Sequence, residues 1–242
     1  MCGIFCSVNR TSHVQPDSVL LEHLRRRGPD SVGHLNSTHM TRDSRTGCQE
    51  THLTFVSTVL SLRSSQIATQ PHQDANGSSV LCWNGEAWSI RGLVTSENDT
   101  TAVFNLLQSA AISSGGLQHP SEEHSAIAKC LATVAGPYSF VFYYRPSGKL
   151  YFGRDFLGRR SLLYKISDGE LILSSVTSGH AGEKWCEVEA DGVYCLDLND
   201  KADRDRSFNS PTLPYGQFTA YKLPYFSATG HNDAPGSSVG LS

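Results

Sequence analysis

Both halves of this chain contain short runs of alternating apolar residues, and helical patterns lie between them. Residues 4–8 fit a strand with Cys6 and Val8 on one face and Phe5 on the other. In the second half, paired runs flank two turn sequences typical of β-hairpins, Pro146-Ser147-Gly148 and Asp168-Gly169. This order favours antiparallel sheets covered by helices over a β-α-β repeat, and so predicts an α+β fold.

Helical spacing occurs in three places. Leucines recur at helical intervals within residues 18–26, and Gly28 with the following proline ends that run. Asn98 or Asp99 can cap a second helix, and Ser121 can cap a third. The second and third of these helices lie in the middle of the chain, and the first follows the opening strand.

Three further stretches have clear composition. Residues 53–63 alternate as a strand does, whereas residues 33–50 are polar without a period and predict a loop. After about residue 200 the chain becomes rich in Ser, Pro, Gly and Asn. We expect a domain over 2–200 and a poorly ordered tail over 201–242; the alternative is that the tail's scattered aromatic residues dock on the domain.

Composition excludes several classes of protein. The chain has 242 residues, a formal net charge of −3 and no long basic run, which argues against nucleic-acid binding. It has no apolar stretch long enough for a membrane span and no secretory signal at its start. Its seven cysteines include no C-x-x-C pair. We therefore expect a reduced, cytoplasmic protein without a metal site.

Cys2 is the residue that most directly suggests chemistry. When the initiator Met1 is removed, Cys2 carries both a thiol and a free α-amine. The thiolate is the reactive form of cysteine, and an α-amine with a pKa of about 7.7–8.0 is in large part a neutral base at cellular pH. One residue then supplies a nucleophile and its general base. The alternative is a buried cysteine near the chain start.

Four short segments accompany Cys2 in a characteristic order. They are Arg27-Gly28-Pro29-Asp30, Gln70-Pro71, Trp83-Asn84-Gly85-Glu86 and the stretch 153–160, which reads G-R-D-F-L-G-R-R. Together with Cys2 they resemble the class II glutamine amidotransferases, and the R-G-P-D segment resembles the asparagine synthetase branch. The resemblance covers about residues 2–200.

The resemblance implies a fold and a reaction. The fold is that of N-terminal-nucleophile (Ntn) hydrolases, a four-layer αββα sandwich of two antiparallel sheets. The reaction converts L-glutamine and water to glutamate and ammonia without a cofactor. In longer relatives the ammonia passes to an ATP-dependent synthetase domain, which is the partner we expect for this chain.

The resemblance also implies roles for particular residues. Cys2 attacks the glutamine amide and forms a thioester, while its α-amine transfers protons. Asn84 and Gly85 match the side-chain and backbone donors that stabilise the oxyanion, and losing one such donor costs about 10²–10³ in rate. Glu86 and Asp99 match the groups that bind the substrate ammonium. The alternative for Asp99 is helix capping alone.

One expected residue is missing. The family carries an arginine for the substrate carboxylate eleven residues before the Gln of the Gln-Pro pair, and that position is Val59 here. A branched apolar side chain cannot replace a bidentate guanidinium. Arg63 is the nearest candidate to bind the carboxylate. We expect Arg154 and Arg160, with the charged residues between them, to form a structural ion-pair corner.

The sequence shows no synthetase half. Ser114-Gly115-Gly116 is only a fragment of a pyrophosphate-binding loop, and the residues after 200 are too few for a nucleotide-binding domain. We therefore expect no ATP binding by this chain alone. Three interpretations stay open: a glutamine-hydrolysing domain, a degenerate module with a regulatory or interaction role, and a thiol hydrolase acting on another amide.

Overall fold

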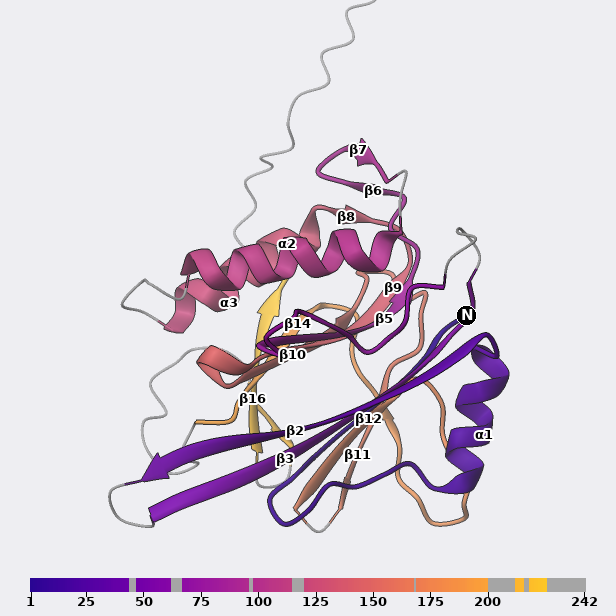
Figure 1. Ribbon diagram of the computed structural model, residues 1–242, viewed down its shortest axis with the longest axis vertical. Coiled ribbons are helices and arrows are strands. Elements are labelled where there is room, and N and C mark those ends of the chain that lie inside the picture. Colours follow the sequence, from indigo (N-terminus) through magenta and orange to yellow (C-terminus); the bar gives the residue numbers. More distant parts are fainter. Residues whose placement is uncertain are drawn as a thin grey trace, which may run out of the picture.

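Two large sheets lie face to face between helices. The computed structural model describes residues 1–43, 47–61, 67–95, 98–114, 120–167, 169–199, 212–215 and 218–225. Helices α2 (Asp99–Ser114) and α3 (Pro120–Ala132) cover the outer face of one sheet, and α1 (Ser18–Arg27) lies against the other (Figure 1). The predicted αββα sandwich of the α+β class is confirmed.

The first sheet has six strands in the order β13-β11-β12-β1-β3-β2, and all neighbours are antiparallel. Their bounds are β1 Gly3–Asn9, β2 Ser31–Asp43, β3 Gly47–Val59, β11 Leu163–Ser167, β12 Glu170–Ser174 and β13 Cys186–Glu187. The chain's first strand therefore lies inside this sheet, between β12 and β3, and has no free edge.

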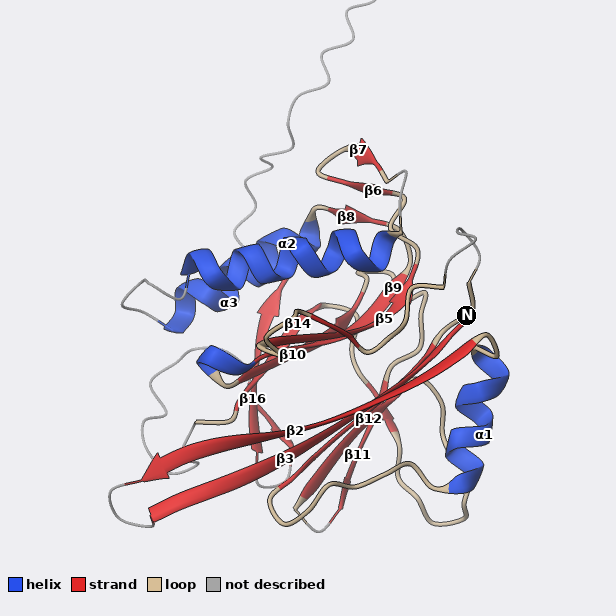
Figure 2. Ribbon diagram, viewed as in Figure 1, coloured by secondary structure: helices blue, strands red, loops and turns tan. Residues whose placement is uncertain are grey.

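The second sheet has seven strands in the order β15-β16-β14-β10-β9-β5-β4, again antiparallel. Their bounds are β4 His72–Gln73, β5 Ser79–Gly85, β9 Tyr138–Tyr144, β10 Lys149–Arg154, β14 Gly192–Asp197, β15 Thr212–Tyr215 and β16 Phe218–Pro224. Figure 2 labels β5, β9, β10, β14 and β16 of this sheet. A small sheet joins β6 (Ser89–Ile90), β7 (Leu93–Val94) and β8 (Val134–Ala135), and a 3₁₀ turn (Arg145–Ser147) links β9 to β10. None of the helices in the described part of the chain has the length and apolarity needed to span a bilayer.

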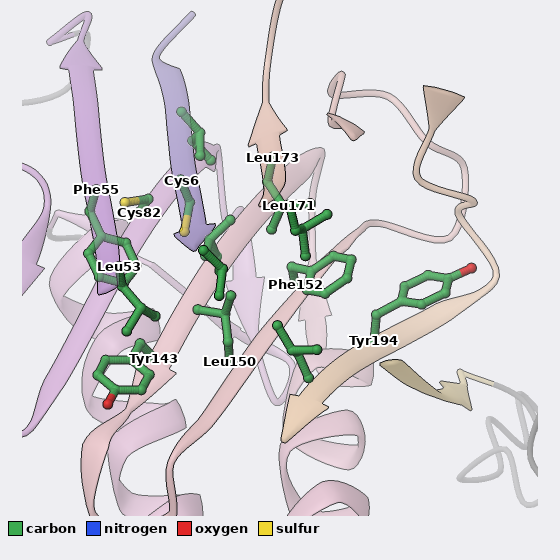
Figure 3. Close-up of a cluster of buried hydrophobic side chains, with 14 of the residues drawn as sticks. Cys6, Leu53, Phe55, Cys82, Tyr143, Leu150, Phe152, Leu171, Leu173 and Tyr194 are labelled. Carbon is green, nitrogen blue, oxygen red and sulfur yellow. The ribbon is translucent and has the colours of Figure 1, made fainter. Parts of the chain in front are cut away.

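The main core fills the space between the two sheets. Alternate residues of β1, β3 and β12 meet alternate residues of β5, β9, β10 and β14, and most of these side chains are completely buried. Figure 3 shows this cluster, with Cys6, Leu53, Phe55, Leu171 and Leu173 from one sheet facing Cys82, Tyr143, Leu150, Phe152 and Tyr194 from the other. Because side chains of a strand alternate, the other half of each strand must be covered from outside.

Helices provide that outer cover. The second sheet sends Trp83, Phe140 and Tyr151, among others, against buried residues of α2 and α3. The first sheet sends Phe5 and Val56 against Leu20 and Leu24 of α1. This confirms the predicted split of β1, with Cys6 and Val8 facing one core and Phe5 the other. It also explains why β9 is apolar or aromatic at nearly every position.

Helix α1 begins and ends by local chemistry. The Asp17 carboxylate accepts hydrogen bonds from the backbone N–H groups of Val19 and Leu20 at 2.9 and 2.8 Å, which caps the first turn. At the other end, a Cβ on Gly28 would lie 2.4 Å from the backbone carbon of Thr58. Only glycine lets the end of the helix approach β3 so closely.

The loop predicted over residues 33–50 is wrong. Of these residues, 33–43 belong to β2 and 47–50 to β3, and the two strands pair from Ser31 opposite Val59 to Asp43 opposite Gly47. As an edge strand, β2 needs no apolar alternation. Its buried polar residue His39 instead forms hydrogen bonds with Tyr143 (3.1 Å) and Asn199 (2.9 Å), far along the sequence. Such long-range partners leave no periodic signal.

Within the predicted poorly ordered tail over 201–242, the described residues 212–215 and 218–225 differ from that expectation because they contain the strands β15 and β16. β16 pairs with β14, and Ala220 is fully buried in the core between the sheets. The Tyr225 hydroxyl donates to the backbone oxygen of Arg154 at 2.6 Å. The alternative of docking aromatic residues therefore holds for this segment, since the open edge of β14 supplies the hydrogen bonds.

A buried polar cluster fixes α3 to the second sheet. Glu123 of α3 is 4% exposed and accepts hydrogen bonds from Tyr151 (2.8 Å) and Ser147 (2.8 Å), and Lys149 lies 3.5 Å from its second oxygen. Next to it, the ring nitrogen Nε2 of His124 lies 3.2 Å from the sulfur of Cys195. Burial, reinforced by the positive charge of Lys149, lowers the pKa of His124 from 6.5 to about 4.

We expect His124 to make the fold sensitive to acid. Between pH 6.5 and about 4 the unfolded chain binds a proton at His124 that the folded chain does not. Neutral His124 therefore makes a contribution to the free energy of unfolding that is complete above pH 6.5. This contribution is lost as the pH falls towards 4, and it amounts to about 3 kcal/mol at most. Urea unfolding at pH 7 and pH 5 should show a smaller pH effect in His124→Gln than in the wild type. An unchanged pH effect in the variant would contradict this assignment.

A charge in β16 should destabilise the domain. Ala220 is 0% exposed between the sheets, so Ala220→Asp places an unpaired carboxylate in the core and should cost a few kcal/mol in the free energy of unfolding. The control is Ala181→Asp, in an exposed loop, which should stay within about 0.5 kcal/mol of the wild type. Equal stability of the two variants would show that β16 is not part of the folded core.

Candidate functional site

One pocket lies where the start of β1 meets the ends of β3 and β5. It has an empty volume of about 620 Å³, which includes its open mouth. Cys2 enters it from the chain start, residues 59–61 from the end of β3, residues 83–86 from the end of β5, and residues 98–100 from the beginning of α2. In Figure 1 the N-terminus lies beside these strand ends, at one end of the sandwich. Five predicted site residues therefore line a single pocket: Cys2, Asn84, Gly85, Glu86 and Asp99.

Cys2 is held by the strand that follows it. The N–H of Ile4 donates to the hydroxyl of Ser175 at 3.1 Å, and the N–H of Ser175 donates to the carbonyl of Ile4 at 2.9 Å. The Cys2 sulfur lies 3.9 Å from the carbonyl oxygen of Leu60. Burial raises the pKa of the Cys2 thiol above its ordinary value. At neutral pH the thiol is protonated, so it needs a nearby base to become a nucleophile.

Met1 is present in the structure, and its ammonium donates to the carbonyl of Arg27 at 3.3 Å. Burial lowers the pKa of this ammonium, and the positive charges of Arg27 and Arg160 lower it further. The Met1 ammonium therefore loses its proton more easily than an amine in water. After removal of Met1, the first amine of the chain is that of Cys2.

Asn84 and Gly85 form the end of β5. Asn84 is fully buried, and its Nδ2 donates to the hydroxyl of Ser139 over a long 3.5 Å. Its Oδ1 is buried and has no hydrogen-bond partner among the described residues. The Asn84 amide therefore keeps hydrogen-bonding capacity that no described residue uses. A Cβ on Gly85 would lie 2.6 Å from Tyr138, so only glycine lets β5 and β9 approach here.

Asp99 is buried at the start of α2, but it does not form the helix cap. The cap is formed by Asn98, whose Oδ1 accepts from the N–H of Thr100 at 3.0 Å. The Oδ2 of Asp99 accepts from the indole N–H of Trp83 at 3.1 Å and from the N–H of Ala87 at 2.9 Å. These two donors hold a carboxylate against the pocket wall.

Gln70 links the elements around the pocket. Its Oε1 accepts from the N–H of Trp83 at 2.7 Å, and its Nε2 donates to the hydroxyl of Thr100 at 3.3 Å. Asp30 stabilises the opposite wall, because its Oδ2 accepts from the N–H of Ser61 at 2.7 Å. The Gln-Pro and R-G-P-D segments thus position the pocket walls, as hydrogen-bonding supports rather than as reactive groups.

Sequence reasoning assigned Arg160 wrongly. Three of the four residues predicted for the ion-pair corner do form ion pairs there: Arg159 pairs with Asp155 at 2.9 Å, and Arg154 pairs with Glu187 of β13 at 3.3 Å. Arg160 instead lines the pocket, where its Nη2 lies 3.2 Å from Oε1 of Glu86. Arg159 and Arg160 are adjacent in the sequence, and only the fold shows that Arg160 is the one that lines the pocket.

Val59 occupies the position at which an arginine for the substrate carboxylate is expected. Val59 is 5% exposed and lines the pocket wall, so the site has an apolar side chain there. Arg63, the substitute suggested by the sequence, lies outside the described residues. Within the described part of the chain, Arg160 is the arginine that lines the pocket.

Comparison with known sequences places this geometry in a family. Residues 1–198 match the glutamine amidotransferase domain. The chain is 39% identical over 206 residues to asparagine synthetase domain-containing protein 1 of Homo sapiens, a match covering 82% of this chain and 28% of that protein. The protein of the same name from Gallus gallus is 36% identical over 210 residues, covering 84% and 30%. The chain therefore spans about three tenths of the length of these curated relatives.

Solved structures agree on the fold. A glutamine phosphoribosylpyrophosphate amidotransferase from B. subtilis, complexed with ADP and GMP, gives a TM-score of 0.54 at 14% identity over 91% of this chain and 49% of that one. A structure of the allosteric regulatory enzyme of purine biosynthesis gives a TM-score of 0.53 at 14% identity, covering 91% of this chain and 48% of that one. The sandwich of β1–β16 is thus an Ntn-hydrolase fold, and the chain belongs to the glutamine amidotransferase domain family.

Proposed function

We propose that this chain hydrolyses the side-chain amide of L-glutamine to glutamate and ammonia. The observation that carries this proposal is the shared pocket of Cys2, the Asn84-Gly85 strand end and the carboxylates of Glu86 and Asp99. A nucleophile, candidate oxyanion donors and anionic groups for an ammonium are the parts that this reaction needs.

The reaction proceeds in two steps after removal of Met1. The Cys2 sulfur attacks the amide carbon, and its proton passes to the α-amine of the same residue. The tetrahedral oxyanion receives hydrogen bonds from Asn84 and Gly85, and the amine returns the proton to the leaving nitrogen, which departs as ammonia. Water then cleaves the thioester by the same route, releasing glutamate and restoring the thiol. These steps need no cofactor.

The ammonia acceptor is the second part of the proposal. Relatives with this domain are named for an asparagine synthetase domain, and about 70% of their length lies outside the matched region. We propose that an ATP-dependent synthetase domain or subunit, joined to or associated with this domain, uses the ammonia to make asparagine.

A specific observation favours a second function. Val59 puts an apolar side chain in the pocket wall at the position where the resemblance to class II glutamine amidotransferases implies a carboxylate-binding arginine. A module that keeps the fold but no longer hydrolyses glutamine, and acts through regulation or interaction, would tolerate that change.

Glutamate release distinguishes the two functions. Protein beginning at Cys2 should release glutamate from L-glutamine, Cys2→Ala should abolish release, and Asn84→Ala should slow it by about 10²–10³. An N-terminal peptide that blocks the amine should be nearly as damaging. Cys48→Ala is the control, since that thiol is exposed on a distant hairpin. If folded wild-type protein releases no glutamate, the non-catalytic module is the better account.

The pH dependence of Cys2 alkylation tests the need for a base. In protein that retains Met1, burial raises the pKa of the thiol, so the alkylation rate should still be rising above pH about 8.5, the ordinary value for cysteine. Peptide mass spectrometry after timed exposure to iodoacetamide measures the rate at Cys2. A rate that levels off below pH 8 would mean a thiolate that needs no partner, contrary to the proposed role of the amine.

A further inference from the structure

The pocket contains a guanidinium whose hydrogen-bonding capacity is poorly used. Arg160 offers five N–H donors in a planar fork. Its Nη2 lies 3.2 Å from Oε1 of Glu86, and its Nη1 lies 3.0 Å from the sulfur of Met1. Its Nε is buried and has no hydrogen-bond partner within the described residues. A thioether is a weak acceptor, so the fork lacks a matching anion on this side.

A second guanidinium points at the same place. Arg27 Nη2 lies 3.8 Å from the Met1 sulfur, and Arg27 Nε donates to the carbonyl of Cys2 at 3.1 Å. Burial lowers the pKa of Arg27, and the positive charge of Arg160 lowers it further. Two cations that converge on a neutral sulfur repel each other, and an anion between them would remove that repulsion.

Removal of Met1 vacates the position between these two cations. The proposed reaction requires that removal, because it frees the Cys2 amine. Met1 and Arg160 both line the pocket that holds Cys2, so the space that the Met1 side chain leaves joins this pocket. A carboxylate fits there better than the methionine did, since it can accept two parallel hydrogen bonds from one guanidinium.

We infer that Arg160, supported by Arg27, binds the α-carboxylate of the substrate at the position of the Met1 side chain. Arg160 then binds the carboxylate that Val59, in place of the expected arginine, cannot bind. The inference rests on the proposed function and names the residue that binds one end of its substrate: the ammonium of the α-amino acid lies near Glu86 and Asp99, and its carboxylate lies near Arg160. The adjacent opposite charges of Glu86 and Arg160 match the adjacent opposite charges of such a zwitterion.

Kinetics of the Met1-free protein test this assignment. Arg160→Met should raise the KM for L-glutamine about 10- to 100-fold with a much smaller change in kcat, because a charge-assisted contact of binding is lost. Arg160→Lys keeps the charge without the fork and should fall between. Arg26→Met is the control, since it removes one exposed cation from the same helix as Arg27.

A substrate without the carboxylate makes the test specific. L-Glutaminamide, in which the α-carboxylate is replaced by a carboxamide, should be a much poorer substrate than L-glutamine for the wild type. Arg160→Met should no longer prefer L-glutamine over this analogue, whereas Arg26→Met should keep the preference. A variant at Arg160 that retains the wild-type KM and the wild-type preference would overturn the inference while leaving the proposed hydrolysis in place.

Binding separates this inference from the proposed reaction. Calorimetry of L-glutamine with Met1-free Cys2→Ala protein should show binding that weakens about 10- to 100-fold when Arg160→Met is added. Arg160-dependent binding by a wild type that releases no glutamate would defeat the hydrolase proposal and support the carboxylate site. If Arg160→Met lowers the unfolding temperature too far for use, the same measurement with Arg160→Lys decides, and unaltered affinity there for both L-glutamine and its amide would count against the site.

Discussion

The hydrogen bonding of β1 on both sides determines where Cys2 lies. β1 is paired with β12 along one edge and with β3 along the other, and Ile4 and Ser175 exchange two further hydrogen bonds at its beginning. Ile4, Cys6 and Val8 fill the core between the sheets, while Phe5 packs towards α1. A slip of one residue would exchange these two sets, so the packing fixes the register and with it the side chain of Cys2.

The surrounding elements place buried polar groups near Cys2 and supply hydrogen-bond partners for them. The buried carboxylate of Asp99 has the indole of Trp83 and the N–H of Ala87, and the amide of Gln70 joins Trp83 to Thr100. Buried polar groups without such partners cost free energy. Within the described part of the chain, two residues of the pocket have a buried side-chain atom without a hydrogen-bond partner: Asn84, at one amide atom, and Arg160, at Nε. Incomplete hydrogen bonding in this part of the molecule coincides with the place where a substrate would bind.

The sequence predicted the features that depend on local patterns or on residues adjacent in the chain. The alternation in β1, the two hairpins of the second half and the extent of α1 follow from periodicity and turn residues, and Cys2 and Asn84 were found through their motifs. The β2–β3 hairpin was missed because His39 is satisfied by Tyr143 and Asn199, which no local window contains. The β16 strand was missed because its composition alone does not predict a strand. It forms one because it pairs with the open edge of β14. The inward position of Arg160 depends on the turn after β10, which the letters G-R-R do not reveal.

The charges beside Cys2 connect substrate binding to the proposed base. In the structure the N-terminal amine lies near Arg27 and Arg160, whose positive charges add to burial in lowering its pKa. An amine with a lowered pKa is neutral more of the time but is also a weaker proton acceptor. When a substrate carboxylate neutralises part of this positive charge, the same electrostatics raise the pKa of the amine. In the proposed mechanism a substrate carboxylate beside Arg27 and Arg160 therefore strengthens the Cys2 amine as a base when the thiol must lose its proton. An amide without a carboxylate would leave the base weak even if it reached Cys2.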